Sequence, residues 1–270
     1  MELSPRNRDD FRDTVWQYYA HHHRAMPWRD DCSLYAVLVS ELMLQQTQVS
    51  RVLPKFAEFM RRFPSIETLA EAPLSEVIVA WQGLGYNRRA KYLHEAAKLV
   101  VDQGASRTVD ALIKLPGVGR NTAGAIMAYV YDEPVVFVET NIRTVYIHHF
   151  FADHHDIHDR DISNLVKQTL DHEHPREWYW ALMDYGAYLK LTDNRLSQSR
   201  HYKKQSPLEG SVRQMRGHIL DVLRRAPIDR HDTDDELQHD ERFNAACEGL
   251  LRDGLIVMTS TKITLSGYNK

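Results

Sequence analysis

The stretch that most constrains the fold of this chain is LPGVGRNTAGAIMAY, residues 115–129. Its first five residues form a turn with two glycines, and glycine allows a backbone to adopt positive φ and to approach another molecule closely. Small residues and apolar spacing predict a helix from Arg120 onward, and the VDALIKL run before the turn has helical spacing as well. The sequence therefore predicts a helix, a hairpin and a second helix over residues 109–129.

The start of the second helix of this hairpin is expected to bind phosphate. The first N–H groups of a helix have no partner within it, and the helix dipole adds partial positive charge there. We therefore expect the hairpin to contact a DNA strand, through Gly117, Val118, Gly119, Arg120 and Thr122. An ordinary corner between two helices is the alternative, because a single G-x-G pattern is weak evidence.

Length and composition allow one large domain or two smaller ones. The chain has 270 residues, of which 43% are hydrophobic, and no run approaches the roughly 18 apolar residues of a membrane span. The polar N-terminus has no secretory signal, and Cys32 and Cys247 offer no disulfide framework, so a reducing cytoplasm is expected. A net charge of -3 argues only weakly against nucleic-acid binding, since local charge matters more than the total.

Apolar periodicity predicts helices, and almost no strands, up to residue 206. Pro27 is expected to end the first of these helices. The expected helices cover residues 8–24, two segments within 33–63, and residues 73–81, 88–103, 142–151, 161–170 and 176–191. This part of the chain is therefore predicted to be an all-helical domain.

Several stretches resemble one known family, the helix-hairpin-helix base-excision DNA glycosylases. This superfamily includes endonuclease III and the MutY-type adenine glycosylases. The hairpin is similar to the hairpin of the whole superfamily, and residues 26–49 and 81–97 are similar to MutY-type enzymes in particular. FVETNIRTV, residues 137–145, falls at the family's catalytic aspartate motif, and residues 181–190 match the helix that follows. The resemblance covers residues 10–206 and implies a two-lobed, all-α glycosylase fold.

The resemblance implies a catalytic role for two carboxyl groups. Breaking an N-glycosidic bond requires protonation of the leaving base and stabilisation of a cationic sugar, and carboxyl groups do both in glycoside hydrolysis. Glu41 takes the place of the acid that protonates adenine, in an apolar segment where desolvation would raise its pKa. Glu139 falls at the catalytic aspartate position, where it is one methylene longer, and Asn141 matches a family asparagine. A surface Glu41 and a solvated Glu139 are the alternatives.

Asn121 bears on the type of glycosylase. Bifunctional relatives have a lysine at this position, which forms a Schiff base with the sugar. Asparagine cannot form one, so a monofunctional enzyme that leaves an abasic site is expected.

Other positions in the resembling stretches are expected to contact DNA or the base. Gln45 and Tyr86 fall where relatives insert side chains into the base stack, which opens when a base is flipped out. The further residues expected to bind DNA are Gln46, Thr47 and Arg88, and the residues expected to line the base pocket are Met26, Trp28, Arg29 and Trp180. Trp180 is usually polar in MutY-type enzymes, which weakens the case for adenine, and it is equally consistent with a core position.

No iron–sulfur cluster is expected. Many relatives hold one on four cysteines, and the aligned positions here are Lys190, Ser197, Arg200 and Ser206, none of which is a thiolate ligand. The loop is basic instead, and Lys203 and Lys204 either contact phosphate or are simply solvated. The resemblance also implies a Na⁺ or K⁺ ion at the hairpin, on the carbonyls of Ile113, Leu115 and Val118.

Residues 210–270 are predicted to form a separate small α+β unit that resembles a winged helix. Helices are expected at 212–224, at 234–238 after Thr233 as a cap, and at 241–253, and a β-hairpin at 255–258 and 262–265. Such units bind DNA, a partner protein or their own copy. The candidate recognition helix, residues 241–253, is not basic. The family's usual C-terminal domain, which recognises oxidised guanine, is expected to be absent.

These observations predict a monomeric, monofunctional base-excision repair glycosylase that acts on double-stranded DNA with a mismatched or damaged base. Adenine opposite guanine is the leading substrate, and thymine or uracil opposite guanine is the alternative. A DNA-structure-binding protein that kept the fold and lost the chemistry is the non-enzymatic alternative. We expect no cofactor beyond the monovalent cation, no membrane association, and a cytoplasmic location at the nucleoid.

Overall fold

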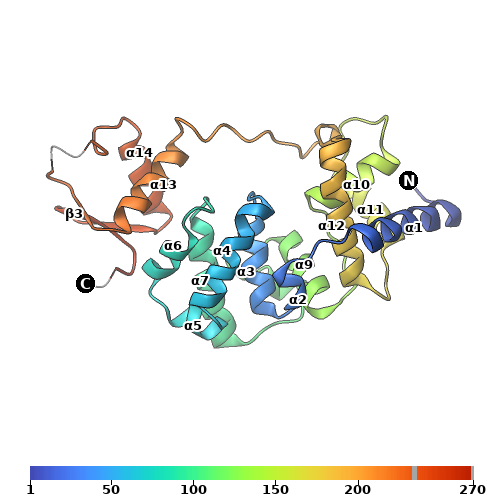
Figure 1. Ribbon diagram of the computed structural model, residues 1–270, viewed down its shortest axis with the longest axis horizontal. Coiled ribbons are helices and arrows are strands. Elements are labelled where there is room, and N and C mark those ends of the chain that lie inside the picture. Colours follow the sequence, from blue (N-terminus) through green and yellow to red (C-terminus); the bar gives the residue numbers. More distant parts are fainter. Residues whose placement is uncertain (233–235, 269–270) are drawn as a thin grey trace. The chain divides into compact units, whose positions relative to one another are not determined.

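The computed structural model describes residues 1–232 and 236–268, and most of them are helical (Figure 1). Up to residue 206 the regular elements are helices, apart from a single bridge between Ile157 and Ser199. Strands occur in the C-terminal part of the described chain. The expected fold class, all-helical with a small α+β unit at the C-terminal end, is therefore confirmed. None of the helices in the described ranges is long and apolar enough to cross a membrane.

The elements follow one another along the chain in three groups. The helices before the hairpin are α1 (Pro5–His22), α2 (Pro27–Asp30), α3 (Leu34–Leu44), α4 (Val49–Arg62), α5 (Ile66–Glu71), α6 (Leu74–Trp81), α7 (Arg88–Gln103) and α8 (Val109–Leu112). After the hairpin come α9 (Arg120–Tyr131), α10 (Thr140–Phe150), α11 (Asp159–Thr169), α12 (Pro175–Thr192) and the 3-10 helix η1 (Leu196–Gln198). The C-terminal part contains α13 (Val212–Leu223), β1 (Ile228–Asp229), α14 (Phe243–Arg252), β2 (Ile256–Met258) and β3 (Lys262–Leu265).

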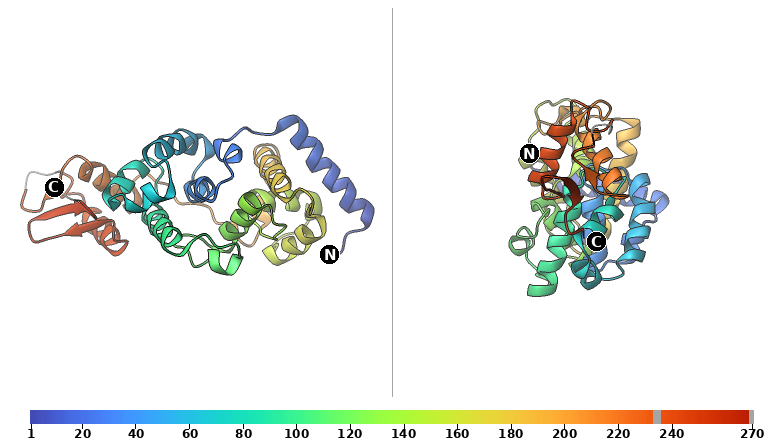
Figure 2. Two further views of the ribbon diagram at one scale, coloured as in Figure 1. Left: turned by 90° about the horizontal axis from the view of Figure 1, so that it is seen from below. Right: turned by 90° about the vertical axis from the view of Figure 1, so that its left-hand side faces the viewer.

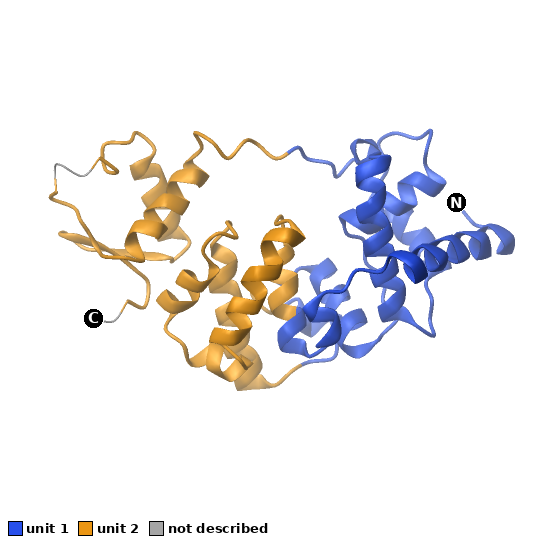
Figure 3. Cartoon of the chain, viewed as in Figure 1, with its two compact units in different colours: residues 1–37, 106–114, 118–204 blue, residues 38–105, 115–117, 205–270 orange. Residues whose placement is uncertain are grey.

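The chain folds into two compact units, which Figure 3 colours separately. Unit 1 consists of residues 1–37, 106–114 and 118–204. Unit 2 consists of residues 38–105, 115–117 and 205–270. Each unit therefore combines segments that are distant in sequence, and the C-terminal residues share a unit with α4 to α7.

Unit 1 is built around aromatic side chains from α1, α10 and α12. The buried ring of Trp178 meets Phe11 edge-on with 6.1 Å between ring centroids, and Phe11 lies 5.1 Å from Tyr146. Each such pair contributes about 0.5–1.5 kcal/mol beyond the burial of its surface. Through Phe11, these contacts fix α1 against α12 and against α10, the helix that begins within the expected catalytic motif.

Unit 2 contains a three-stranded antiparallel sheet in the order β1-β3-β2, drawn in red in Figure 2. Its register pairs Ile228 with Ile263 and Ile256 with Leu265, and these four side chains are buried. They belong to one apolar cluster with residues of α13 and α14 and with Ile78 of α6. The C-terminal residues therefore share a core with the helical part of unit 2.

Most expected helices are confirmed, but some elements differ from the expectation. Pro27 begins α2 rather than ending the first helix, which already stops at His22. Helix α5, which begins with a capping box between Ser65 and Thr68, strand β1 and the 3-10 helix η1 were not expected. Thr233 and the first residues of the expected helix 234–238 lie outside the described residues, and residues 236–238 form a turn.

Candidate functional site

Glu139 is the N-cap of α10, and its carboxylate folds back onto the start of that helix. Oε1 accepts hydrogen bonds from the backbone N–H groups of Asn141 at 2.5 Å and Ile142 at 2.9 Å. Oε2 lies 3.5 Å from Nδ2 of Asn141. The N-cap side chain that accepts hydrogen bonds from the first N–H groups of a helix is usually a shorter one, from serine, threonine, aspartate or asparagine. The extra methylene of glutamate is therefore accommodated by capping, and Glu139 and Asn141 are brought together.

The protonation of Glu139 is set by opposing effects. Burial raises the pKa of its carboxyl group. The two backbone donors and the positive charges of Lys190 and Arg143 act in the opposite direction, but the net shift is upward. Lys190 is half-buried on α12, and burial lowers the pKa of its ammonium while the charge of Glu139 raises it. The carboxyl group and the amine therefore influence each other within unit 1.

Asn121 supports the segment that leads into Glu139. Its Nδ2 donates a 2.6 Å hydrogen bond to the backbone carbonyl of Val138, the residue directly before Glu139. The sequence indicated only what Asn121 cannot do as a nucleophile. Its positioning contact spans 17 residues and has no signature in the sequence.

Helix α12 packs on the start of α10 through one face. A Cβ atom added at Gly186 would lie 2.3 Å from the carbonyl oxygen of Asn141, so the two backbones are in direct contact. Nδ2 of Asn141 also lies 3.5 Å from the sulfur of Met183. The other side-chain atom of Asn141, Oδ1, is buried and receives no hydrogen bond from any described residue. An acceptor is therefore available beside Glu139.

The residues expected to line a base pocket lie in unit 1, and two of them, Arg29 and Trp180, are in contact. The Arg29 guanidinium lies 5.5 Å above the ring centre of Trp180 and makes two 2.8 Å hydrogen bonds with Asp184. Trp180 is partly exposed, whereas Met26 and Trp28 are buried. The structure places all four residues in one unit, and their role in a base pocket stays a prediction.

Asp184 is a residue that the sequence did not single out. It is buried, and Arg24 donates to it at 2.7 Å in addition to Arg29. Burial raises the pKa of this carboxyl group, but the hydrogen bonds and charges of the two arginines outweigh that effect and hold the pKa below its usual value. Asp184 therefore stays ionised and fixes the α2 segment to α12.

Glu41 lies on α3 within unit 2, between the buried residues Ser40 and Leu42. Its own side chain is only half-buried. Glu41 is therefore neither fully solvated nor fully buried, and its role as an acid stays a prediction.

Arg89, which the sequence did not indicate, joins the end of α3 to the turn before α7. Its buried guanidinium donates to the carbonyls of Leu42 at 2.6 Å and Gln45 at 2.6 Å, and to Gly85 at 2.9 Å. Burial lowers its pKa to about 10, so it remains charged at neutral pH. It thereby sets the conformation of two segments that were expected to bind DNA.

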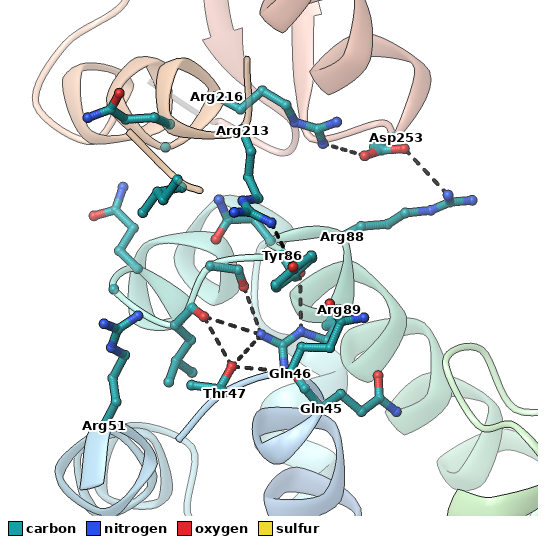
Figure 4. Close-up of a pocket in the computed structure, with 18 of the residues that line it drawn as sticks. Gln45, Gln46, Thr47, Arg51, Tyr86, Arg88, Arg89, Arg213, Arg216 and Asp253 are labelled. Atoms are coloured by element: carbon teal, nitrogen blue, oxygen red, sulfur yellow. Dashed lines mark hydrogen bonds and ion pairs between the residues drawn. The ribbon is translucent and has the colours of Figure 1, made fainter. Parts of the chain in front are cut away.

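Those two segments line one cavity of about 1060 Å³, shown in Figure 4. The expected DNA-binding residues brought together there are Gln45, Gln46, Thr47, Tyr86 and Arg88. Gln46 and Tyr86 have φ values of 56° and 47°, in the left-handed region that non-glycine residues rarely occupy. Such strain recurs at binding sites and costs about 1–3 kcal/mol per residue.

The hairpin glycines differ in conformation. Gly117 has a φ of 79°, its carbonyl accepts a 3.1 Å hydrogen bond from Gln45, and an added Cβ would lie 3.0 Å from Tyr92. Gly119, by contrast, has a φ of -86° and acts as the exposed N-cap of α9, so positive φ is needed only at Gly117. Gly117 and Leu115 belong to unit 2, and the other hairpin residues expected to bind DNA or a cation belong to unit 1: Ile113, Val118, Gly119, Arg120 and Thr122. These roles stay predictions.

The segment aligned with the cluster ligands is held by polar contacts. Arg200 pairs with Asp156, Ser199 forms a backbone bridge with Ile157, and Gln198 donates to the carbonyl of Ala152 at 2.8 Å. Lys190, Ser197, Arg200 and Ser206 supply no thiolate, so they do not fit an iron–sulfur cluster. Lys203 and Lys204 are exposed beyond this segment.

Comparison with known proteins agrees with this architecture. Residues 39–170 match the model of the HhH-GPD superfamily base excision DNA repair proteins. The adenine DNA glycosylase of Mycolicibacterium smegmatis is 35% identical over 272 residues, which cover 90% of this chain and 91% of that protein. The adenine DNA glycosylase of Buchnera aphidicola is 33% identical over 192 residues, 68% of this chain but only 54% of that protein, so this chain spans about half of its length.

A solved structure shows the same fold. A thermostable thymine-DNA glycosylase superposes with a TM-score of 0.60 at 24% identity, over 67% of this chain and 87% of that one. The sequence relatives extend over most of the chain, and the glycosylase fold is present. The chain therefore belongs to the HhH-GPD superfamily of base excision DNA repair proteins.

Proposed function

We propose that this protein is a monofunctional DNA glycosylase that removes adenine mispaired with guanine. Relatives named adenine DNA glycosylase, one of them matching nine-tenths of both chains, support this substrate. The observation that carries the proposal is the arrangement at the start of α10, where Glu139 is hydrogen-bonded to Asn141 and Asn121 is hydrogen-bonded to the carbonyl of Val138, the residue before Glu139.

Glu139 is proposed to stabilise the positive charge that develops on the sugar. A carboxylate in a partly desolvated site interacts more strongly with a developing cation than it would in water. The neighbouring Oδ1 of Asn141 is a buried acceptor with no donor among the described residues, and it suits a water molecule or a sugar hydroxyl. The pair can therefore hold a water molecule for attack on the sugar carbon.

Glu41 is proposed to protonate the adenine as it leaves. A neutral leaving group lowers the barrier to bond cleavage, and a positioned general acid typically contributes about 10²–10⁴-fold to the rate. Glu41 is half-buried on α3, which limits the hydration of its carboxyl group relative to that of an exposed glutamate.

Asn121 supports the monofunctional assignment. An amide is not a nucleophile toward the sugar carbon, and this amide is engaged with the carbonyl of Val138. The reaction is therefore proposed to end with a free base and an intact strand that carries an abasic site.

Thymine or uracil opposite guanine is the second candidate substrate. The observation in its favour is Trp180, a large ring with the Arg29 guanidinium 5.5 Å above it, at a position that is usually polar in MutY-type enzymes. An altered pocket of this kind would suit a different base.

A panel of duplexes, each with one mismatch, tests the proposal. The purified protein should release free adenine from the A·G duplex and produce strand breaks only after alkali. Release of thymine or uracil but not of adenine would show that the substrate is a mispaired pyrimidine. If no base is released from any duplex, the protein is a DNA-structure-binding protein rather than a glycosylase.

A further inference from the structure

The cavity in unit 2 concentrates positive charge on an otherwise acidic protein. Its lining includes five arginines, Arg51, Arg88, Arg89, Arg213 and Arg216, and two aspartates, Asp221 and Asp253. Five positive and two negative charges leave a net charge of +3 on the lining, whereas the whole chain has a formal net charge of -3. The cavity is therefore suited to an anion.

The two aspartates neutralise only part of this charge. Asp253 pairs with Arg216 and lies 3.6 Å from Arg88. Asp221 pairs with Arg224 and Arg225, which do not line the cavity. Within the described ranges, no carboxylate lies within ion-pair distance of the remaining arginines, which are Arg51, Arg89 and Arg213.

Three helices begin at the cavity wall and add to the positive potential. Gln48 precedes α4, Asn87 precedes α7, and Val212 is the first residue of α13. The side chains of Gln48 and Asn87 make no capping hydrogen bond, so they do not occupy the first N–H groups of α4 and α7. Backbone donors and helix dipoles at such starts favour phosphate.

Tyr86 lies where the C-terminal residues meet the turn before α7 (Figure 4). Its hydroxyl accepts hydrogen bonds from Arg213, at 2.8 Å, and from Gln205. The guanidinium groups of Arg213 and Arg89 lie 5.4 Å and 5.6 Å from the centre of its ring. A residue expected to enter the DNA base stack is thus in direct contact with α13.

The lining of the cavity suits a nucleic-acid strand. Its volume of about 1060 Å³ lies at the upper end of the roughly 300–1,000 Å³ found for ligand pockets. Six glutamines line it, which can donate to and accept from base edges: Gln45, Gln46, Gln48, Gln82, Gln205 and Gln214. These features fit phosphodiester groups with exposed bases.

We propose that this cavity binds the phosphodiester backbone of the DNA, and that α13 of the C-terminal part supplies a phosphate contact through Arg213, opposite Arg51 of α4. This inference rests on the proposed function, because the ligand is the DNA that a glycosylase would act on. It assigns DNA contact to the first turns of α13, whereas the sequence pointed to residues 241–253 as the candidate recognition helix.

Binding of a fluorescein-labelled A·G duplex, measured over a range of salt concentrations, tests the site. Arg213→Gln and Arg51→Gln should each weaken binding about tenfold or more and reduce the slope of log K against log salt by about one. The matched control is Arg252→Gln, the same charge change at an exposed end of α14 that does not line the cavity. It should keep wild-type affinity and slope.

The outcomes separate this inference from the proposed function. If the wild type binds DNA and both cavity variants match Arg252→Gln, the cavity is not a DNA site, although the glycosylase proposal stands. If the wild type does not bind DNA at all, both proposals are wrong. Arg51 is exposed on α4, so its variant should fold normally even if the loss of the Arg213 contacts disturbs the C-terminal part.

Discussion

Gly186 and Asn141 are in backbone contact: a Cβ atom at Gly186 would lie 2.3 Å from the Asn141 carbonyl oxygen. Only glycine allows α12 to approach the start of α10 this closely. That approach brings Met183 and Lys190, which are also on α12, toward Asn141 and Glu139. The geometry proposed to be catalytic therefore depends on a residue that has no side chain.

Gly186→Ala should destabilise unit 1 and slow base release. The methyl group meets backbone atoms that cannot move away cheaply, and overpacking of this kind typically costs about 1–3 kcal/mol. Thermal unfolding measures the effect. Gly217→Ala is the matched control, since a Cβ there meets nothing within 4 Å, and it should leave stability unchanged or raise it by up to about 1 kcal/mol. Equal melting temperatures for the two variants would refute the close contact.

Lys190→Met should shift the acid limb of the pH–rate profile to higher pH. Burial raises the pKa of Glu139, and the charge of Lys190 opposes that shift. If catalysis needs the ionised carboxylate, the rate falls as the pH drops through this raised pKa. Removing the ammonium raises the pKa further, so activity is lost at a higher pH than in the wild type.

Single-turnover rates across the pH range measure this shift, with two comparison variants. Lys190→Arg keeps the charge and should restore the wild-type profile. Lys167→Met removes an exposed charge on α11 and should not move the limb. A Lys190→Met profile that overlays the wild type would show that the amine does not act on Glu139.

Asn121→Lys should convert a non-trapping protein into one that borohydride links covalently to DNA. The wild-type amide cannot form a Schiff base, and lysine at this position supplies the missing amine. Asn121→Ala is the companion variant: it loses the 2.6 Å hydrogen bond to Val138, and it should slow base release about tenfold without trapping. Efficient trapping of the wild type on a gel would mean that another lysine acts as the nucleophile.

The purified protein should be colourless and contain no stoichiometric iron. None of Lys190, Ser197, Arg200 and Ser206 is a thiolate, and the ion pair between Arg200 and Asp156 helps to hold this segment instead. Iron analysis and the visible spectrum measure this directly. One iron–sulfur cluster per chain, with its broad visible absorbance, would contradict the prediction.

The helical framework was predictable because long amphipathic helices repeat a clear apolar pattern. Helix α7 was expected at residues 88–103 and is found at Arg88–Gln103. Short elements gave no such pattern: α5 has six residues and β1 has two. Both depend on a local cap or on a partner strand rather than on periodicity.

The candidate site was only partly predictable. The resemblance supplied Glu139 and Asn141, which the structure brings together, but not the residues that support them. Arg89 and Asp184 are buried charges: Asp184 pairs with Arg29, 155 residues away in the sequence, and Arg89 donates to backbone carbonyls such as that of Leu42. A charged residue inside a helical sequence looks the same whether it is solvated or buried, so such contacts have no sequence signal.

The measurement that tests the central claim most directly is the release of free adenine from an A·G duplex in a single turnover. The wild type should release adenine, whereas Glu41→Gln and Glu139→Gln should still bind the duplex and release it at least about 10²-fold more slowly, since neither amide can donate a proton or carry the negative charge. Wild-type rates in both variants, or no base release by the wild type from any mismatched duplex, would contradict the account.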